Sequence, residues 1–408
     1  MASVLGFLRL HGWTDYTLGD PALPLGISFF TFTQIGFLLD VRHGAVQEKG
    51  LTSYLLFVTF FPHLIAGPVL HHREMMPQFA ASRTYRLSDE NILIGLTIFS
   101  IGLAKKMLAD QLSAIAAPGF SSAEPLALLP AWQAALGYSL QLYFDFSGYS
   151  DMAIGIARLF NIRFPANFNS PYKAQSVIEY WQRWHMTLTR YLTLYLYNPI
   201  SLRIARGRAA RGLTLGRRPS FGGFAATVLL PTFITMTLAG AWHGSGLTFL
   251  VFGLLHATYL SINHAWRMFR PASWKPSRSA AGVVRRVALT YACVLAGAVV
   301  FRAETLADAG GILAAMLGLN GVAPAASMHE HALTIARDWA LIALAAGIAF
   351  GTPNTQQIMR DFAPVLNTVA GSGWAWGPSV GWALAFGCLG ALGLLAVGGS
   401  AEFLYFQF

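Results

Sequence analysis

The stretch AGAWHGSGLTFLVFGLLHATY (residues 239–259) is almost continuously apolar, yet it contains two histidines, His243 and His256. An ionisable side chain is costly inside a bilayer, so it indicates a functional site by default. Gly244 follows His243 directly, and glycine lets a ligand or another backbone approach closely. The alternative is a histidine that only hydrogen-bonds a neighbouring membrane helix. We favour a functional role for His243.

The two histidines are 13 residues apart, which is about 220° around a continuous helix at 100° per residue. On this spacing His243 and His256 cannot bind a metal ion from one helix face. The sequence has no HExxH or CxxC ligand motif, no GxSxG serine elbow and no Walker or GxGxxG phosphate loop. We therefore expect no metal site and no bound cofactor. The chemistry indicated is histidine-assisted transfer, in which a neutral imidazole takes a proton from an attacking hydroxyl.

The composition surrounding this stretch is that of a membrane protein. Of the 408 residues, 55% are hydrophobic and only 11% are charged, whereas a soluble domain carries about 25% charged residues. Since a span takes about 20 apolar residues, the pattern predicts an all-α polytopic protein of roughly ten membrane segments, some short or re-entrant. We expect residues 1–408 to form a single membrane domain. Cys293 and Cys388 lie in apolar runs and provide no disulfide framework.

The predicted segments differ in how uniform they are. The clear ones are 92–109, 222–241, 246–263, 286–301, 337–351 and 379–398. The less uniform ones are 23–40, 51–70, 131–146 and 187–200, with a short further helix expected at 149–162. Residues 1–22 show neither a cleavable signal pattern nor a long apolar span.

The net charge of +10 does not indicate nucleic-acid binding, because the basic residues lie between apolar segments. The stretch SLRIARGRAARGLTLGRRPS (201–220) carries six arginines and no acid. The positive-inside rule predicts a cytoplasmic loop here. These arginines either serve topology alone or attract anionic lipid or the phosphates of a nucleotide-like donor.

A second region of polar residues spans 141–191 and centres on Trp181-Gln182-Arg183-Trp184-His185. Its other polar members upstream are Asp145, Asp151, Asn167 and Asn169. We expect Gly148 and Pro165 to interrupt the helix, so that the backbone bends around a protein-lined cavity. The alternative for Asp145 and Asp151 is a structural pairing with Arg158 or Arg163.

Aromatic residues are frequent in and around this region, and most are expected to be anchors at the membrane interface. They are Trp132, Tyr138, Tyr143, Tyr149, Tyr180, Trp181 and Trp184.

The motifs described so far resemble those of the membrane-bound O-acyltransferase (MBOAT) family. WQRWHMTLTRY (181–191) and AWHGSGLTFLVFGLLHA (241–257) are similar to the two histidine regions of that family, in its bacterial branch of alginate O-acetyltransferases and teichoic-acid D-alanyl transfer proteins. Similar features are found at 25–41, 60–79, 136–172 and 352–359 and in the terminal FLYFQF. The resemblance therefore covers most of the chain.

This resemblance implies a helical fold around a central tunnel, which an acyl donor enters from the cytoplasm and an acceptor from the other face. The invariant family histidine corresponds to His243, and a second conserved polar position corresponds to His185. The chain also departs from the pattern. Helices that relatives carry before the LGISFFTF motif are expected to be missing, and TRYLTLYLYNP (189–199) lacks the acid of an Arg-Asp-Tyr segment.

The resulting prediction is an O-acyltransferase of the bacterial cytoplasmic (inner) membrane. It would move an acyl group, expected to be acetyl from acetyl-CoA, to a hydroxyl of an exported or cell-envelope polysaccharide. His243 would be the general base, and His185 would orient a substrate or relay a proton. Trp184 and Trp242 would exclude water from the thioester. These two, with Asp145 and Asn169, are the predicted substrate-binding residues.

Two other functions remain open on the sequence. A transporter or channel could use buried histidine and aspartate as a proton relay, or the chain could hand its acyl group to a separate extracytoplasmic partner protein. His185 has its own alternative, which is packing beside Trp181 and Trp184 at the interface.

Overall fold

The computed structural model describes residues 26–48, 50–65, 67–213, 220–271, 273–322, 332–367, 370–371 and 373–396. Every regular element in these ranges is a helix, which confirms the all-α fold. The predictions made for residues 1–22, for Arg217 and Arg218 and for the terminal FLYFQF lie outside the described residues.

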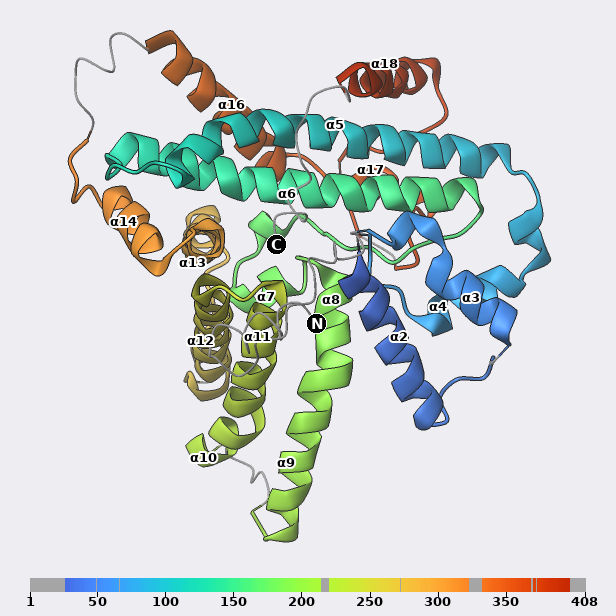
Figure 1. Ribbon diagram of the computed structural model, residues 1–408, viewed down its shortest axis with the longest axis horizontal. Coiled ribbons are helices and arrows are strands. Elements are labelled where there is room, and N and C mark those ends of the chain that lie inside the picture. Colours follow the sequence, from blue (N-terminus) through green and yellow to red (C-terminus); the bar gives the residue numbers. More distant parts are fainter. Residues whose placement is uncertain are drawn as a thin grey trace, which may run out of the picture.

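Two helices of 32 residues, α5 (Asp89–Phe120) and α6 (Leu128–Leu159), run side by side across the molecule (Figure 1). Ser88 caps the first turn of α5 by accepting a hydrogen bond from the Asn91 backbone, and acidic residues follow in the first turn, where they favour the positive end of the helix dipole. Helices α16 (Ala332–Gly351) and α18 (Val380–Ala396) pack against this pair.

Glycines bring α5 and α6 close together. A Cβ atom added to Gly102 would lie 2.6 Å from the Gly148 carbonyl oxygen, and one added to Gly95 would lie 2.7 Å from that of Gly155. The pairs 95–155 and 102–148 show that the helices are antiparallel. Small residues are what membrane helices use for such close contact. The prediction that Gly148 interrupts the helix is therefore wrong, because α6 continues through it to Leu159, and Pro165 lies beyond its end.

Lysine–aspartate pairs join the same two helices. Lys106 Nζ lies 2.9 Å from Asp145 Oδ1, and Lys105 Nζ lies 2.5 Å from Asp151 Oδ2. Asp151 also accepts hydrogen bonds from the side chains of Thr355 and Gln356. The carboxylates are thus paired, but with lysines of α5 rather than with the arginines expected from the sequence. Sequence proximity had favoured Arg158 and Arg163, whereas the antiparallel packing presents lysines.

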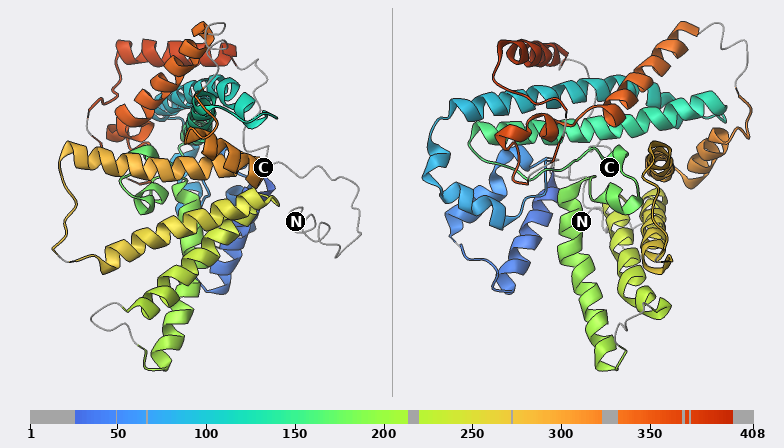
Figure 2. Two further views of the ribbon diagram at one scale, coloured as in Figure 1. Left: turned by 90° about the vertical axis from the view of Figure 1, so that its left-hand side faces the viewer. Right: turned by 180° about the vertical axis from the view of Figure 1, so that it is seen from behind.

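A second group of helices lies on one side of the α5–α6 pair, as both views of Figure 2 show. Its members follow one another along the chain. They are α7 (Val177–Trp181), α8 (Met186–Leu192), η4 (Thr193–Tyr197), α9 (Asn198–Ala210), α10 (Phe221–Phe224), η5 (Ala225–Leu229), α11 (Leu230–His243), α12 (Leu247–Phe269), α13 (Ala280–Arg302) and α14 (Leu306–Met316). Half of the predicted arginine loop is therefore helical, since α9 continues to Ala210.

The N-terminal described helices form a third group beside α8 and α9 (Figure 1). They are α2 (Ile27–Arg42), α3 (Leu51–Thr59), η1 (Phe61–His63), α4 (His72–Ala80) and η2 (Ser82–Tyr85). Short helical turns elsewhere are η3 (Pro171–Lys173), α17 (Thr355–Ile358) and η6 (Arg360–Phe362).

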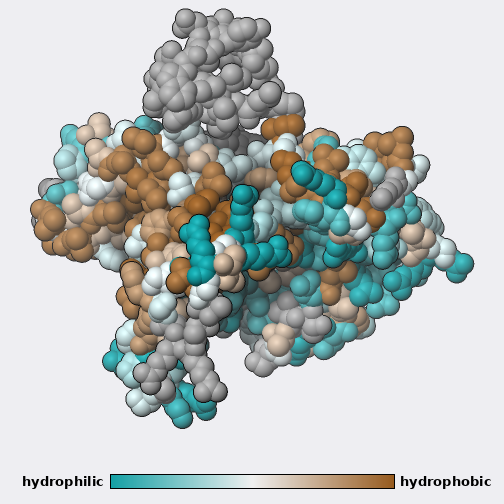
Figure 3. Space-filling view, turned by 90° about the horizontal axis from the view of Figure 1, so that it is seen from below, coloured by the Kyte–Doolittle hydropathy of each residue, from teal (hydrophilic) through white to brown (hydrophobic). Residues whose placement is uncertain are grey.

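The surface is that of a membrane protein. Among the described residues, four helices are long and apolar enough to cross a bilayer, namely Asp89–Phe120, Phe221–His243, Ala280–Arg302 and Ala332–Gly351. Large apolar side chains are widely exposed. Brown areas are seen on the face drawn in Figure 3, and elsewhere Leu344 of α16 and Leu384 of α18 are 58% and 63% exposed. Such exposure is costly in water and favourable in lipid. The larger number of about ten segments stays a prediction.

Candidate active site

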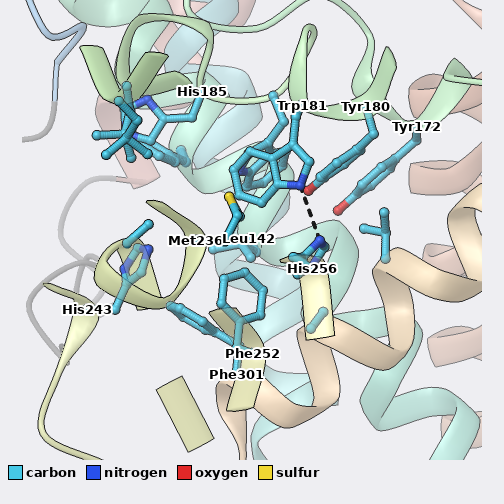
Figure 4. Close-up of a pocket in the computed structure, with 17 residues that line it drawn as sticks. Leu142, Tyr172, Tyr180, Trp181, His185, Met236, His243, Phe252, His256 and Phe301 are labelled. Carbon is cyan, nitrogen blue, oxygen red and sulfur yellow. Dashed lines mark hydrogen bonds between the residues drawn. The ribbon is translucent and has the colours of Figure 1, made fainter. Parts of the chain in front are cut away.

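A pocket of about 60 Å³ lies where α6, α7, α8, α11, α12 and α13 meet. Its wall is mostly aromatic and aliphatic, and three histidines interrupt it: His185, His243 and His256. Figure 4 shows His185 and His243 at one end of the pocket and His256 at the other. The two histidines that the sequence singled out as catalytic are therefore brought to one cavity, although 58 residues separate them in the chain.

His243 is the last residue of α11, which ends because Gly244 adopts an extended backbone. The imidazole is half-buried among aromatic rings. The ring centroids of Trp242 and Phe301 lie 4.7 Å and 5.0 Å from its own, and that of Phe252 lies at 6.2 Å. Apolar surroundings disfavour a charge, so this environment stabilises the neutral imidazole, which is the form that can accept a proton.

His185 occupies the residue before α8 in a left-handed conformation (φ 42°, ψ 52°). A non-glycine residue in this conformation costs free energy and is found preferentially at functional sites. The surrounding structure holds it there, because the Met186 backbone donates to the Asn167 carbonyl at 2.9 Å and the side chain is buried. The strained turn directs the imidazole to the pocket wall.

Asn167 sets the tautomer of His185. Its Nδ2 donates to Ser150 Oγ at 3.0 Å, which leaves Oδ1 as the acceptor facing His185 Nδ1 at 3.0 Å and Thr187 Oγ1 at 2.8 Å. His185 Nδ1 must therefore carry the proton. Its Nε2 is then a lone-pair acceptor that is buried and has no hydrogen-bond partner among the described residues. A buried acceptor without a partner is costly, and it is suited to receive a substrate hydrogen bond.

His256 shares the pocket for a reason that helical spacing missed. The helix is interrupted at residues 244–246. His243 therefore ends α11, while His256 lies in α12, which packs against α11. The 220° separation on one helix consequently does not apply. His256 Nδ1 accepts a hydrogen bond from the Trp181 indole at 3.2 Å (Figure 4). Gly297 makes room for this ring, since a Cβ atom there would lie 2.6 Å from His256 Nε2.

The two tryptophans predicted to bind substrate lie close to these histidines. Trp184 lines the pocket and packs edge-on against Phe168 at 5.1 Å between ring centroids. Trp242 is not among the lining residues but packs behind His243. The centroids of its ring and the rings of Phe29 and Phe32 are 6.0 Å and 5.0 Å apart.

Asp145 and Asn169 lie elsewhere. Asp145 is paired with Lys106 between α5 and α6. Asn169 accepts a hydrogen bond from Asn354 Nδ2 at 2.9 Å, and its backbone carbonyl accepts one from Arg183. Neither side chain lines the pocket, so this geometry gives no support to their predicted contact with substrate.

Several aromatic residues expected at the membrane interface are in fact core residues. Tyr138, Tyr143, Tyr180 and Trp184 are all less than 10% exposed, and Tyr180 and Trp181 line the pocket. The sequence could not separate an anchor from a cavity wall, because both need an aromatic ring beside polar groups.

Comparison with known proteins agrees with this architecture. Residues 39–216 match the model of the MBOAT, membrane-bound O-acyltransferase, family. The chain therefore belongs to that family, as the resemblance of its histidine regions indicated.

The relatives include enzymes that act on cell-envelope polymers. The chain is 41% identical over 363 residues to a peptidoglycan O-acetyltransferase of Helicobacter pylori, covering 78% of this chain and 63% of the relative. It is 40% identical to a probable alginate O-acetylase of Azotobacter vinelandii, covering 78% and 58%. It is 24% identical to a teichoic acid D-alanyltransferase of Bacillus subtilis, covering 68% and 70%.

The chain thus spans about three fifths of the length of the O-acetyltransferase relatives it matches.

Proposed function

We propose that this protein is an O-acyltransferase of the bacterial cytoplasmic membrane that moves an acetyl group from acetyl-CoA to a hydroxyl of an exported or cell-envelope polysaccharide. The observation that carries the proposal is the pocket that holds His185 and His243 within an aromatic wall. The O-acetyltransferase relatives support the reaction type and the choice of acetyl as the acyl group.

In the proposed step, His243 acts as the general base. Its neutral imidazole takes the proton of the acceptor hydroxyl while the hydroxyl oxygen bonds to the thioester carbonyl carbon. The carbon–sulfur bond then breaks, and the imidazolium returns the proton to the departing thiolate. The reaction needs neither a metal ion nor a covalent enzyme intermediate.

His185 would position the acceptor. With Nδ1 committed as a donor to Asn167, its Nε2, which has no partner among the described residues, accepts a hydrogen bond from a second, non-reacting hydroxyl of the acceptor. This contact holds the attacking hydroxyl in line with the thioester carbonyl. Trp184 forms part of the wall and Trp242 supports His243 from behind. Both would help to exclude the water that hydrolyses a thioester.

The membrane arrangement belongs to the same proposal. About ten membrane segments would surround a tunnel, with acetyl-CoA entering from the cytoplasm and the glycan from the other face. The arginines of α9 and Arg211, which follows its last residue, would face the cytoplasm. Arg203, Arg206 and Arg211 are exposed. An extracytoplasmic partner protein would complete the transfer if the acceptor cannot reach the pocket.

The decisive experiment is mass spectrometry of envelope and exported glycans from cells with and without this protein, joined to an assay in nanodiscs with radiolabelled acetyl-CoA. We expect O-acetyl esters on one glycan only when the protein is present, with equal consumption of thioester. Ester-bound label that accumulates on a second protein would place the chain in a relay. Movement of an unmodified solute without ester formation would identify a transporter and overturn the proposal.

A further inference from the structure

A cluster of metal-ligand side chains lies outside the histidine pocket. It consists of Asp40 near the end of α2 and the consecutive His71 and His72 at the start of α4. None of the three lines the pocket, and the proposed transfer does not use them. One ligand atom from each residue lies within 4.8 Å of the other two.

The distances within the cluster are those between ligands of one metal ion. Nε2 of His72 lies 2.9 Å and Nε2 of His71 lies 3.2 Å from the same oxygen, Asp40 Oδ2. Zinc bonds of 2.0–2.1 Å to histidine nitrogen and carboxylate oxygen put the corners of a tetrahedron about 3.3 Å apart. The two distances to Asp40 Oδ2 are within a few tenths of an ångström of this spacing, and the third, between the two histidines, is at most 4.8 Å.

The local backbone explains why two neighbouring histidines aim at one point. His72 begins α4, whereas His71 precedes it with an extended backbone (φ −112°, ψ 135°). This change of conformation turns the first ring back beside the second, so that their centroids lie 4.5 Å apart with 31° between the ring planes. Consecutive residues within a helix would point about 100° apart.

Tyr195 of η4 completes the surroundings. Its hydroxyl lies 3.0 Å from His71 Nε2 and 3.1 Å from Asp40 Oδ2. These distances are close to those expected for the fourth ligand position of a tetrahedral zinc ion. The three groups are mostly buried, with side-chain exposures of 16%, 5% and 14% for His71, His72 and Asp40. Two imidazoles and one carboxylate are ligands that favour zinc and similar transition metals over magnesium or calcium.

From this geometry we propose that Asp40, His71 and His72 bind one zinc ion, with a fourth position beside the Tyr195 hydroxyl. The ion would join α2 to α4 and η4. Tyr195 packs on Tyr191, Tyr191 on Phe32, and Phe32 on Trp242. The site would thus fix the helices that support Trp242 from behind, without touching the reacting groups.

The same residues also form a hydrogen-bond network without metal. In it, His72 and Tyr195 donate to Asp40, and His71 Nδ1 accepts a long bond of 3.3 Å from the Arg73 backbone. Zinc would replace the protons on the two Nε2 atoms. His71 Nδ1 would then carry its proton and give up the bond from Arg73. A measurement of metal binding therefore separates the two states.

The test uses the full chain without a polyhistidine tag, purified in detergent, stripped with a chelator and titrated with Zn²⁺ and with Co²⁺ as a spectroscopic probe. We expect one equivalent of either ion per chain and the visible absorption of tetrahedral Co²⁺. Asp40→Asn and His72→Gln should each weaken binding by more than about tenfold. His43→Gln is the matched control, since His43 is exposed one turn beyond Asp40, and it should bind as the unaltered chain does.

Binding that is unchanged in Asp40→Asn would overturn the proposal, as would a titration without a saturable equivalent. If the variants do not fold, the unaltered chain decides alone. Tetrahedral Co²⁺ absorption together with a rise in melting temperature on adding Zn²⁺ supports the site. An octahedral spectrum, or no thermal shift, identifies the metal-free hydrogen-bond network.

Discussion

The α5–α6 interface and the histidine pocket both place polar side chains in apolar surroundings, but they differ in how those side chains are satisfied. At the interface, Lys106 and Asp145 lie 2.9 Å apart, and Asp151 is bonded by Lys105, Thr355 and Gln356. In the pocket, Nε2 of His185 is buried without a hydrogen-bond partner among the described residues. Buried polar groups are normally paired. Several other buried side-chain atoms also have no hydrogen-bond partner among the described residues, but only the His185 nitrogen belongs to a residue that lines the pocket, where a substrate would bind.

Packing shows the same contrast. The interface is tightened by glycines whose missing side chains let the two backbones touch, while the pocket is surrounded by aromatic rings and leaves a cavity of about 60 Å³. The α5–α6 interface is therefore suited to close contact between helices, and the histidine pocket to binding a ligand. Substitutions in the pocket should reduce turnover, whereas substitutions at the interface should reduce stability.

The largest effect is expected from His243→Ala. Loss of a general base should lower acyl transfer by about 10²–10⁴-fold, while the protein stays folded and membrane-inserted. Initial rates in nanodiscs, normalised to folded protein, would measure this. His264→Ala is a suitable control, because His264 is half-buried on α12 and lies outside the pocket. Near-normal turnover in His243→Ala would exclude His243 as the base.

The second-largest loss of acyl transfer is expected from His185→Ala. The rate should fall by up to about 10²-fold, because the acceptor is misplaced. His185→Asn should retain more activity, since its amide still donates and accepts hydrogen bonds but cannot act as a base. The ratio of the two rates is the measurement. If Asn and Ala are equally inactive, proton transfer rather than positioning is the role of His185; if both are fully active, it only packs.

At the interface, Asp145→Asn should lower the free energy of unfolding by about 1.5–3 kcal/mol, because Lys106 loses its buried counter-charge and keeps only the more exposed Asp110. Denaturation in detergent would measure the change. The rate per folded molecule should stay close to that of the unaltered protein. A selective loss of turnover with unchanged stability would indicate that Asp145 binds substrate. It would contradict the distinction between an interface that determines stability and a pocket that determines turnover.

The smallest effect is expected from Gly102→Ala. The added Cβ atom would lie 2.6 Å from the Gly148 backbone oxygen, so the helices must move apart at a cost of about 1–3 kcal/mol. Gly347→Ala is the matched control, because no atom of the described residues lies within 4 Å of a Cβ atom at this helical glycine. Equal melting temperatures for the two variants would show that the close glycine contact contributes little.

Much of the candidate site was predicted from residues that stand out locally. His243 and His185 were identified because they are ionisable groups in apolar or aromatic sequence, and the structure brings both to one cavity. Asn167 was noted only as a polar residue, yet it sets the tautomer of His185. Trp181 was interpreted as an anchor and His256 as facing away, although the two are hydrogen-bonded in the pocket wall.

The partners of the buried polar side chains could not be predicted from neighbouring residues in the sequence. Asp145 and Asp151 were expected beside arginines a few residues along, but an antiparallel neighbour helix supplies lysines about 40 residues earlier. Likewise, no motif search finds Asp40 with His71 and His72, because the metal-ligand spacing exists only after α2 packs near α4 and η4.

The sequence by itself determined that this protein resides in a lipid bilayer and which family it belongs to. Hydropathy is a local property, so apolar runs with few charges are enough to specify membrane helices, and the histidine motifs are enough to identify the MBOAT family. Only the tertiary structure decided which polar groups are paired, and that His185 Nε2 lies at the pocket without a partner from the described part of the chain. That depends on contacts between residues far apart in the chain, such as Gly102 with Gly148 and Trp181 with His256, which helical periodicity cannot encode.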